Sequence, residues 1–227
     1  MTMGIHERDL FHLTYPERLV DEGDCRRCRE LDDRFRAQRR AKGPQAHAEA
    51  WFPPLLDTWL SALSDESFDP FDCPAETLCM VGVTFTKSLA MRDALIVAAI
   101  VDGDAWTPEL LCEFASQPHG EHTGMRMGDL LSRAFDAVDA PSPSRRGRME
   151  RALALCERAG EVVPRQYAGQ PFAVAAYIAW WMGSSRSLSL ATLASDIDGD
   201  ISLAGIVRTA VLRRVGPAWT HRRQCRE

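Results

Sequence analysis

The C-terminal part of the chain, residues 171–219, contains three apolar segments, each closed by residues that end helices. The segments are residues 172–182 followed by Gly183, residues 188–193 followed by an Asp/Gly turn at 196–200, and residues 201–215 followed by Gly216 and Pro217. Apolar runs of this length with glycine, proline and aspartate between them are typical of short helices joined by tight turns. This pattern predicts a C-terminal unit of three helices.

Helical spacing of apolar residues dominates the rest of the chain as well. Residues 55–63 carry a stripe of leucine and tryptophan, and we expect Pro53 and Pro54 in the first turn of that helix, where a missing N–H costs least. Further helices are predicted over 88–101, 107–115, 125–138 and from 144 through 156. Residues 78–85 have the composition of a short strand, and residues 160–169 are expected to be irregular. The predicted fold is therefore all-α, an irregular multi-helix bundle that ends in the three-helix unit.

Charge and apolar content divide the chain into three zones. Residues 1–45 include a charged run from 26 to 40 with few apolar side chains. This run predicts an N-terminal arm that is a solvated helix, a mobile segment or a small zinc-stabilised module. Residues 46–219 form the predicted helical domain, and 220–227 form a polar tail. The net charge of −5 argues against a nucleic-acid-binding protein, which needs an excess of positive charge.

The cellular compartment is predicted from the N-terminus and the cysteines. Charged residues precede the first apolar run, unlike in a signal peptide, and the most apolar window, 172–182, is about half as long as a membrane-spanning helix. The seven cysteines are an odd number, which favours reduced thiols over a complete disulfide framework. We therefore expect a cytoplasmic protein that has no membrane partner.

A CxxC motif formed by Cys25 and Cys28 is the sharpest local chemical signal. Two cysteines at this spacing can bind one zinc ion, and Cys73 and Cys79 would complete a four-cysteine site, although their separation exceeds the usual two to four residues. Further candidate ligands are His12, His47, His119 and His122. Two other interpretations stay open for the CxxC cysteines: a redox dithiol, whose thiolates the two intervening arginines would stabilise, and inert thiols.

Three other polar motifs are interpreted as structural. His119 and His122 lie in a predicted loop and lack the i, i+4 spacing of histidines in a helical zinc site. Residues 196–200 resemble the start of a calcium loop, but the glycine and glutamate that such a loop requires are absent from the expected positions. Residues 145–148 contain three arginines, which could contact nucleic acid or an acidic partner and are interpreted as a solvated linker.

Two segments resemble a known protein family. The matching residues are Arg92, Asp93 and Ala94 in one segment, and Ala176, Ala179, Trp180, Gly183, Asp200, Ser202, Leu203, Ala204, Gly216, Pro217 and Trp219 in the other. These segments resemble the C-terminal helical half of the actinobacterial and actinophage domain-of-unknown-function family DUF4192. The N-terminal strands of that family are not visible in this chain. The resemblance implies a phage or actinobacterial source and no established activity.

The matching residues are interpreted as structural. Trp180 is expected in the core, Gly183 at a helix C-terminus with positive φ, and Asp200 or Ser202 as the cap of the last helix. Arg92 and Asp93 are expected to form an ion pair, either buried or on the surface.

The sequence contains no catalytic motif as clear as its helical pattern. We therefore expect a non-enzymatic helical binding or regulatory protein that acts through contacts with a protein partner, with self-association left open. Exposed aromatic residues at Trp51 and Phe52, or at Trp180 and Trp181, would anchor the interface. The alternative is a zinc-containing enzyme, or a zinc-stabilised nucleic-acid-binding module, that uses the four cysteines or the histidine loop.

Overall fold

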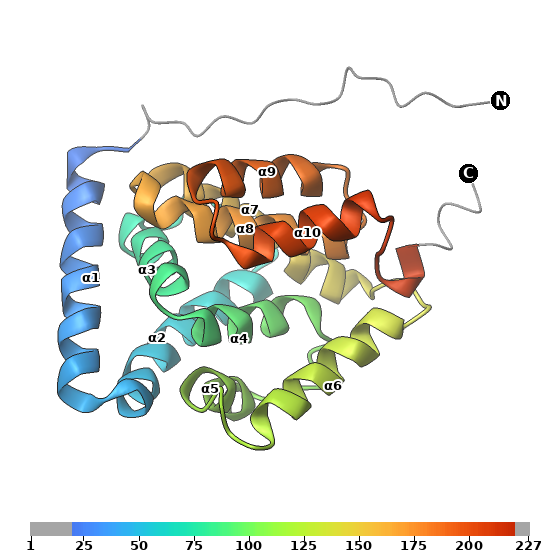
Figure 1. The fold of residues 1–227 in the computed structure, drawn as a ribbon, viewed down its shortest axis with the longest axis horizontal. Helices are drawn as coiled ribbons and strands as arrows, with labels where there is room; N and C mark the ends of the chain where they lie inside the picture. The colour runs from blue at the N-terminus through green and yellow to red at the C-terminus, as the bar shows by residue number, and fades with distance from the viewer. Residues whose placement is uncertain (1–19, 221–227) are drawn as a thin grey trace.

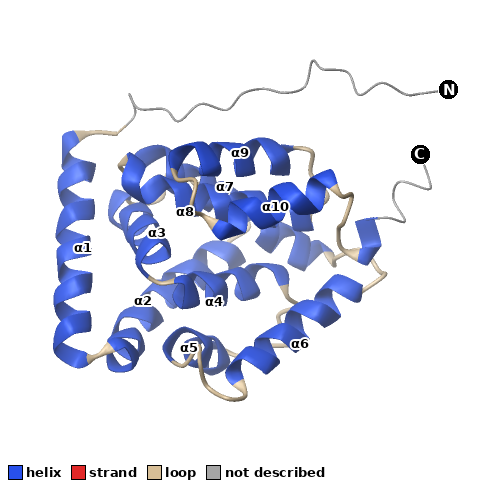
Figure 2. Ribbon diagram, viewed as in Figure 1, coloured by secondary structure: helices blue, strands red, loops and turns tan. Residues whose placement is uncertain are grey.

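The computed structural model describes residues 20–220, which form ten α-helices of nine residues or more and no β-strand (Figure 2). The helices are α1 (Glu22–Lys42), α2 (Pro44–Ser64), α3 (Ala75–Lys87), α4 (Leu89–Ile100), α5 (Pro108–Ser116), α6 (Thr123–Asp136), α7 (Pro143–Val162), α8 (Arg165–Trp181), α9 (Arg186–Ile197) and α10 (Ser202–Leu212). The all-α prediction is confirmed. No helix in the described part of the chain is long and apolar enough to cross a membrane.

The helices surround α8, which packs against α3, α4, α7, α9 and α10. In Figure 1, α7 to α10 lie together on one side, α2 and α4 cross the middle, and α5 and α6 lie on the opposite side. Helix α1 stands along one edge of the molecule, where it contacts α2 and α3. The three predicted C-terminal helices are present as α8, α9 and α10.

Small side chains allow the neighbours of α8 to approach it closely. Ala176 and Ala179 are fully buried, and Gly160 of α7 leaves room for the ring of Phe172. A Cβ atom added to Gly160 would lie 2.7 Å from that ring. An alanine-rich helix in a densely packed core is therefore the physical basis of this part of the fold.

The end of α8 confirms the predicted role of Gly183. This residue has a φ of 66°, its N–H donates to the Trp180 carbonyl at 3.0 Å, and the N–H of Ser184 donates to the Ala179 carbonyl at 2.9 Å. These two bonds form a Schellman motif, which satisfies carbonyl groups at the helix end and favours glycine at the left-handed position.

Three local predictions are wrong. The segment predicted as a strand, 78–85, belongs to α3, which is buried on so many sides that its apolar run shows no clear period. The segment predicted as irregular contains the end of α7 and the start of α8, separated by a turn at Pro164. Pro53 and Pro54 lie inside α2, whose first turn is occupied by Pro44.

The charged N-terminal run forms α1, and one face of this helix is buried. Asp21 caps the helix by accepting from the Asp24 N–H at 2.7 Å. The buried residues recur at helical spacing and are Cys28, Leu31, Asp32 and Phe35. The cysteine, leucine and phenylalanine belong to the same hydrophobic core as the other helices, and the predicted zone boundary at residue 45 falls inside α2.

The arginines of 145–148 cap another helix, so their interpretation as a solvated linker is wrong. Arg145 is 3% exposed, and its Nε donates to the Ile100 carbonyl at 2.6 Å. Arg148 Nη2 donates to the Val101 carbonyl at 2.6 Å. Both carbonyls lie at the C-terminal end of α4, where cations and N–H donors are stabilising. Arg146 is exposed and pairs with Glu150.

Several aromatic and capping residues lie elsewhere than predicted. Trp51, Phe52 and Trp181 are buried, so they do not provide exposed interface anchors. Trp180, predicted in the core, is only partly buried, and its Nε1 donates to the Val215 carbonyl at 2.8 Å. The position before α10 is Ile201, and no side chain caps that helix, so the predicted cap at Asp200 or Ser202 is not formed.

Candidate functional site

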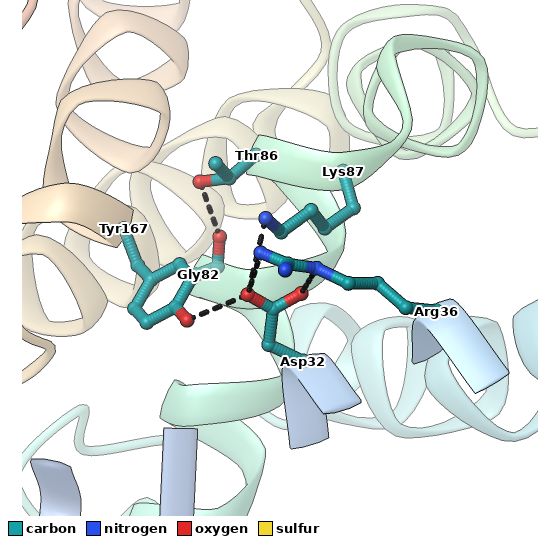
Figure 3. A network of polar contacts seen from close by, with 6 residues as sticks. All are labelled: Asp32, Arg36, Gly82, Thr86, Lys87 and Tyr167. Carbon is teal, nitrogen blue, oxygen red and sulfur yellow. Dashed lines mark hydrogen bonds and ion pairs between the residues drawn. The ribbon is translucent and has the colours of Figure 1, made fainter. Parts of the chain in front are cut away.

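A buried carboxylate joins three helices that are far apart in the sequence. Asp32 of α1 accepts two hydrogen bonds from Arg36, at 2.9 and 2.7 Å, and one at 2.8 Å from the hydroxyl of Tyr167 on α8. Lys87 of α3 lies 3.1 Å from the same carboxylate. Figure 3 shows these donors converging on Asp32 from α1, α3 and α8. The carboxylate is saturated with partners, so we interpret its role as holding these helices together.

The pKa values of the network follow from burial and from these donors. Burial raises the pKa of Asp32, but the hydrogen bonds from Tyr167, Lys87 and Arg36 together outweigh it and leave the pKa below its usual value. Burial, followed by the hydrogen bond to Asp32, raises the pKa of Tyr167 to about 12. Asp32 is therefore charged and Tyr167 is protonated at neutral pH.

A cleft of about 590 Å³ lies next to this network. It opens between the end of α3, the first turns of α8, and the segment that joins α9 to α10. Its volume falls in the range of ligand-binding sites. The residues that line it are Thr86, Pro164, Arg165, Gln166, Gly169, Gln170, Ile197, Asp198 and Ile201.

One of the two glutamines of the cleft is oriented by a buried charged residue. Gln166 is exposed and precedes Tyr167, whose hydroxyl donates to Asp32. Gln170 Oε1 accepts from Arg92 Nη1 at 2.7 Å, and Arg92 is 5% exposed. Arg92 also pairs with Asp93, whose side chain is 40% exposed, so the predicted ion pair has one buried and one partly exposed member. The Gln170 amide is thus held by a buried arginine.

The two glutamines of the cleft suit binding rather than proton transfer. Glutamine amides do not titrate and are not nucleophiles, and each carries both hydrogen-bond donors and an acceptor. The Thr86 hydroxyl donates to the Gly82 carbonyl at 2.8 Å, which leaves its oxygen as an acceptor toward the cleft (Figure 3). Ile197 and Ile201 add apolar surface beside these polar groups.

The four predicted zinc ligands are only partly brought together. Cys28 of α1 and Cys79 of α3 are both buried, and the Cys79 sulfur lies 3.8 Å from the carbonyl oxygen of Asp24 on α1. Cys25 lies on α1 and is partly exposed, whereas Cys73 precedes α3 and lies near Arg158 of α7. Among residues 20–220, no three His, Cys, Asp or Glu side chains form a group that could hold a metal ion. A zinc site at Cys25, Cys28, Cys73 and Cys79 stays a prediction.

The histidines proposed as ligands are scattered. His47 is buried between Phe35 and Trp51, and His119 and His122 are exposed in the turn before α6. His12 lies outside the described residues. Burial, and then the charges of Arg39 and Lys42, lower the pKa of His47.

Sequence reasoning missed the cleft because Gln166 lies in the segment expected to be irregular, 160–169, and Gln170 directly follows it. Pro164 followed by two polar residues is a recognisable helix start, and the Gln166–Gln170 spacing places both amides on one face of α8. No sequence signal identified Asp32 and Tyr167 as partners.

The chain was compared with protein-family models, curated proteins and solved structures, and none of them matches. The resemblance to DUF4192 therefore stays a prediction. What can be inferred about function comes from the geometry of the cleft.

Proposed function

We propose that this is a non-enzymatic binding protein, and that its cleft takes an extended segment of a partner protein. The observation that carries the proposal is the pair of amides, Gln166 and Gln170, one helical turn apart on the cleft wall. Because the amide of Gln170 accepts from Arg92 through its oxygen, its Nε2 is the group left to donate to a ligand. Gln166 is exposed, and its amide oxygen can accept from the same ligand.

This pairing of one donor with one acceptor matches the chemistry of a peptide backbone. A residue in an extended chain presents its own N–H and C=O on the same edge, as it does toward a neighbouring strand. Gln166 can accept from that N–H while Gln170 donates to that C=O. Side chains of the segment that point into the cleft would contact Ile197 and Ile201. Backbone bonds would supply affinity, and the apolar surface would supply selectivity, as in other modes of extended-peptide recognition.

Pre-organisation supports the same proposal. Ordering a flexible side chain at an interface costs about 0.5–1.5 kcal/mol. Gln170 already has a hydrogen-bond partner, Arg92, that fixes one end of its amide, so less of this cost falls on the binding step.

The experiment that tests the proposal is selection of peptides from a displayed random library on the full chain, followed by calorimetry. We expect the selected peptides to bind the Gln166→Leu variant about three- to tenfold more weakly, because one backbone hydrogen bond is lost. Gln45→Leu is the matched control, since Gln45 is exposed on α2 and bonds only Glu49 among the described residues. Peptides that bind all three proteins equally would refute the cleft as the binding site.

The zinc-containing alternative retains one supporting observation: the Cys79 sulfur lies against the first turn of α1, the helix that carries Cys25 and Cys28. Elemental analysis of the purified chain tests it: about one zinc ion per chain, lost in Cys28→Ala, would support a zinc module. A cytoplasmic location, a phage or actinobacterial source and self-association also remain proposals that the cleft does not address.

A further inference from the structure

A small pocket with aromatic walls lies between α6 and the last turns of α8. Its volume is about 220 Å³, below the roughly 300–1,000 Å³ of sites for drug-sized ligands, so it suits a small chemical group. The function proposed above does not use this pocket. The residues that line it are Leu131, Ser132, Phe135 and Asp136 of α6, and Tyr177 and Trp181 of α8.

The spacing of these residues places each set on one face of its helix. Phe135 follows Leu131 by four residues, and Trp181 follows Tyr177 by four, so each pair is about one helical turn apart. The two walls of the pocket are therefore held by helices rather than by a loop.

The rings of the pocket stand at steep angles to one another. The planes of Phe135 and Trp181 are inclined by 85°, with centroids 5.9 Å apart. The planes of Tyr177 and Trp181 are inclined by 69°, with centroids 6.2 Å apart. Trp181 is 2% exposed, whereas Phe135 and Tyr177 are partly exposed. The pocket therefore combines one buried ring with two differently oriented rings that reach the surface.

Trp180 supports two of these rings from outside the pocket. Its ring centroid lies 5.8 Å from that of Phe135 and 5.5 Å from that of Tyr177. The indole is itself fixed, because its Nε1 donates to the Val215 carbonyl at 2.8 Å. The aromatic walls are thus ordered before a ligand arrives, which lowers the entropy cost of binding.

The charge of the lining selects a cation. Asp136 is exposed and acidic, and none of the described residues that line the pocket is basic. The faces of aromatic rings attract cations through their quadrupole. A lysine ammonium carries three donors that must find acceptors, whereas a quaternary ammonium has no N–H and loses no hydrogen bond against an aromatic wall.

We propose that this pocket binds a trimethylammonium group, carried by a small molecule of the choline type or by a trimethyllysine of another protein. The methyl groups contact the rings of Phe135, Tyr177 and Trp181. The carboxylate of Asp136 balances the positive charge at the rim. Aromatic cages of this kind recognise quaternary ammonium ligands in other proteins.

The test titrates the full chain with choline at constant ionic strength, followed by calorimetry and tryptophan fluorescence. The matched ligand is the neutral analogue of choline in which carbon replaces the nitrogen. We expect choline to bind saturably and the neutral analogue to bind about five- to thirtyfold more weakly, because it gains no cation–π attraction. A trimethyllysine peptide that binds more tightly than choline and than its unmodified counterpart would assign the ligand to a protein, and the reverse order would assign it to a small molecule.

Three variants locate the site. Phe135→Leu and Tyr177→Leu each remove one ring and should weaken choline binding about two- to fivefold. Asp136→Asn alters an exposed side chain, so it leaves the core intact. It should weaken choline binding at low salt without changing the binding of the neutral analogue. Asp129→Asn is the matched control, because Asp129 is exposed on the same helix and does not line the pocket.

Three results would overturn the proposal. One is the absence of saturable binding by both choline and the trimethyllysine peptide. Another is equal affinity for choline and its neutral analogue, which would mean that the pocket does not select a cation. The third is choline binding that Phe135→Leu, Tyr177→Leu and Asp136→Asn all leave unchanged, which would place the ligand elsewhere.

Discussion

The hydroxyl group of Tyr167 offers the most quantitative test of how α1 is held on the bundle. The substitution Tyr167→Phe keeps the ring, which is almost completely buried, and removes the O–H that donates to Asp32 at 2.8 Å. Asp32 keeps Arg36 and Lys87 as partners. A hydrogen bond to a charged group contributes about 1.5–3 kcal/mol, so we expect the free energy of unfolding to fall by about that amount.

The assay is urea unfolding at neutral pH, followed by circular dichroism. The slope of the unfolding free energy against urea should not change, because the same surface is exposed in both proteins. Tyr177→Phe is the matched control on the same helix, since Tyr177 forms no hydrogen bond to a charged group within residues 20–220, and the substitution should cost less than about 1 kcal/mol. Equal losses for the two variants would refute the network as an energetic link.

A double-mutant cycle separates the bond from the ring environment. In an Asp32→Asn background, the partner of the Tyr167 hydroxyl is no longer charged, so Tyr167→Phe should cost less than it does in the wild type. An unchanged cost would mean that the hydroxyl acts independently of the carboxylate.

The pH dependence of the unfolding free energy in acid gives a second test of the network. Because the pKa of Asp32 is lowered in the folded protein, this carboxylate contributes its full stabilisation above about pH 3.8. That stabilisation is lost as the pH falls through the folded pKa.

Three further perturbations have expected outcomes by urea unfolding. Arg145→Met should cost about 2–4 kcal/mol, because the Ile100 carbonyl loses its buried donor, whereas Arg146→Met should have little effect. Gly160→Ala should cost about 1–3 kcal/mol, because its Cβ would overlap the Phe172 ring. Below pH 6.5, His47 gains a proton more readily in the unfolded chain than in the folded protein, so the wild type should lose up to about 1.4 kcal/mol of unfolding free energy per pH unit. His47→Phe should abolish this loss. An unchanged pH dependence of stability in the variant would contradict the assignment to His47.

The sequence predicted those helices in which the apolar residues and the helix-ending residues indicate the same boundary. The end of α8 at Gly183 is an example, since an apolar run and a left-handed glycine indicate the same boundary. Helix α3 was missed because burial on most of its sides removes the periodic pattern. The burial of α1 was missed because only Leu31 and Phe35 are typical core residues, while the other buried positions are a cysteine and an aspartate.

The candidate site was much less predictable than the fold. Asp32 and Tyr167 are separated by most of the chain, and a buried ion network is created by packing, which single-sequence patterns do not report. The same holds for Arg92 and Gln170, which belong to different helices. The CxxC motif suggested equal roles for Cys25 and Cys28, whereas in the structure Cys25 is partly exposed and Cys28 is buried.

The most direct test of the account is an NMR titration of the ¹⁵N-labelled full chain with a peptide selected on it. The side-chain amide signals of Gln166 and Gln170 report the two groups that we propose to bind the peptide backbone. The account predicts that both signals shift and saturate at the peptide concentration that saturates binding, while the signal of Gln45 does not move. Saturable binding that leaves the Gln166 and Gln170 signals unchanged would contradict it.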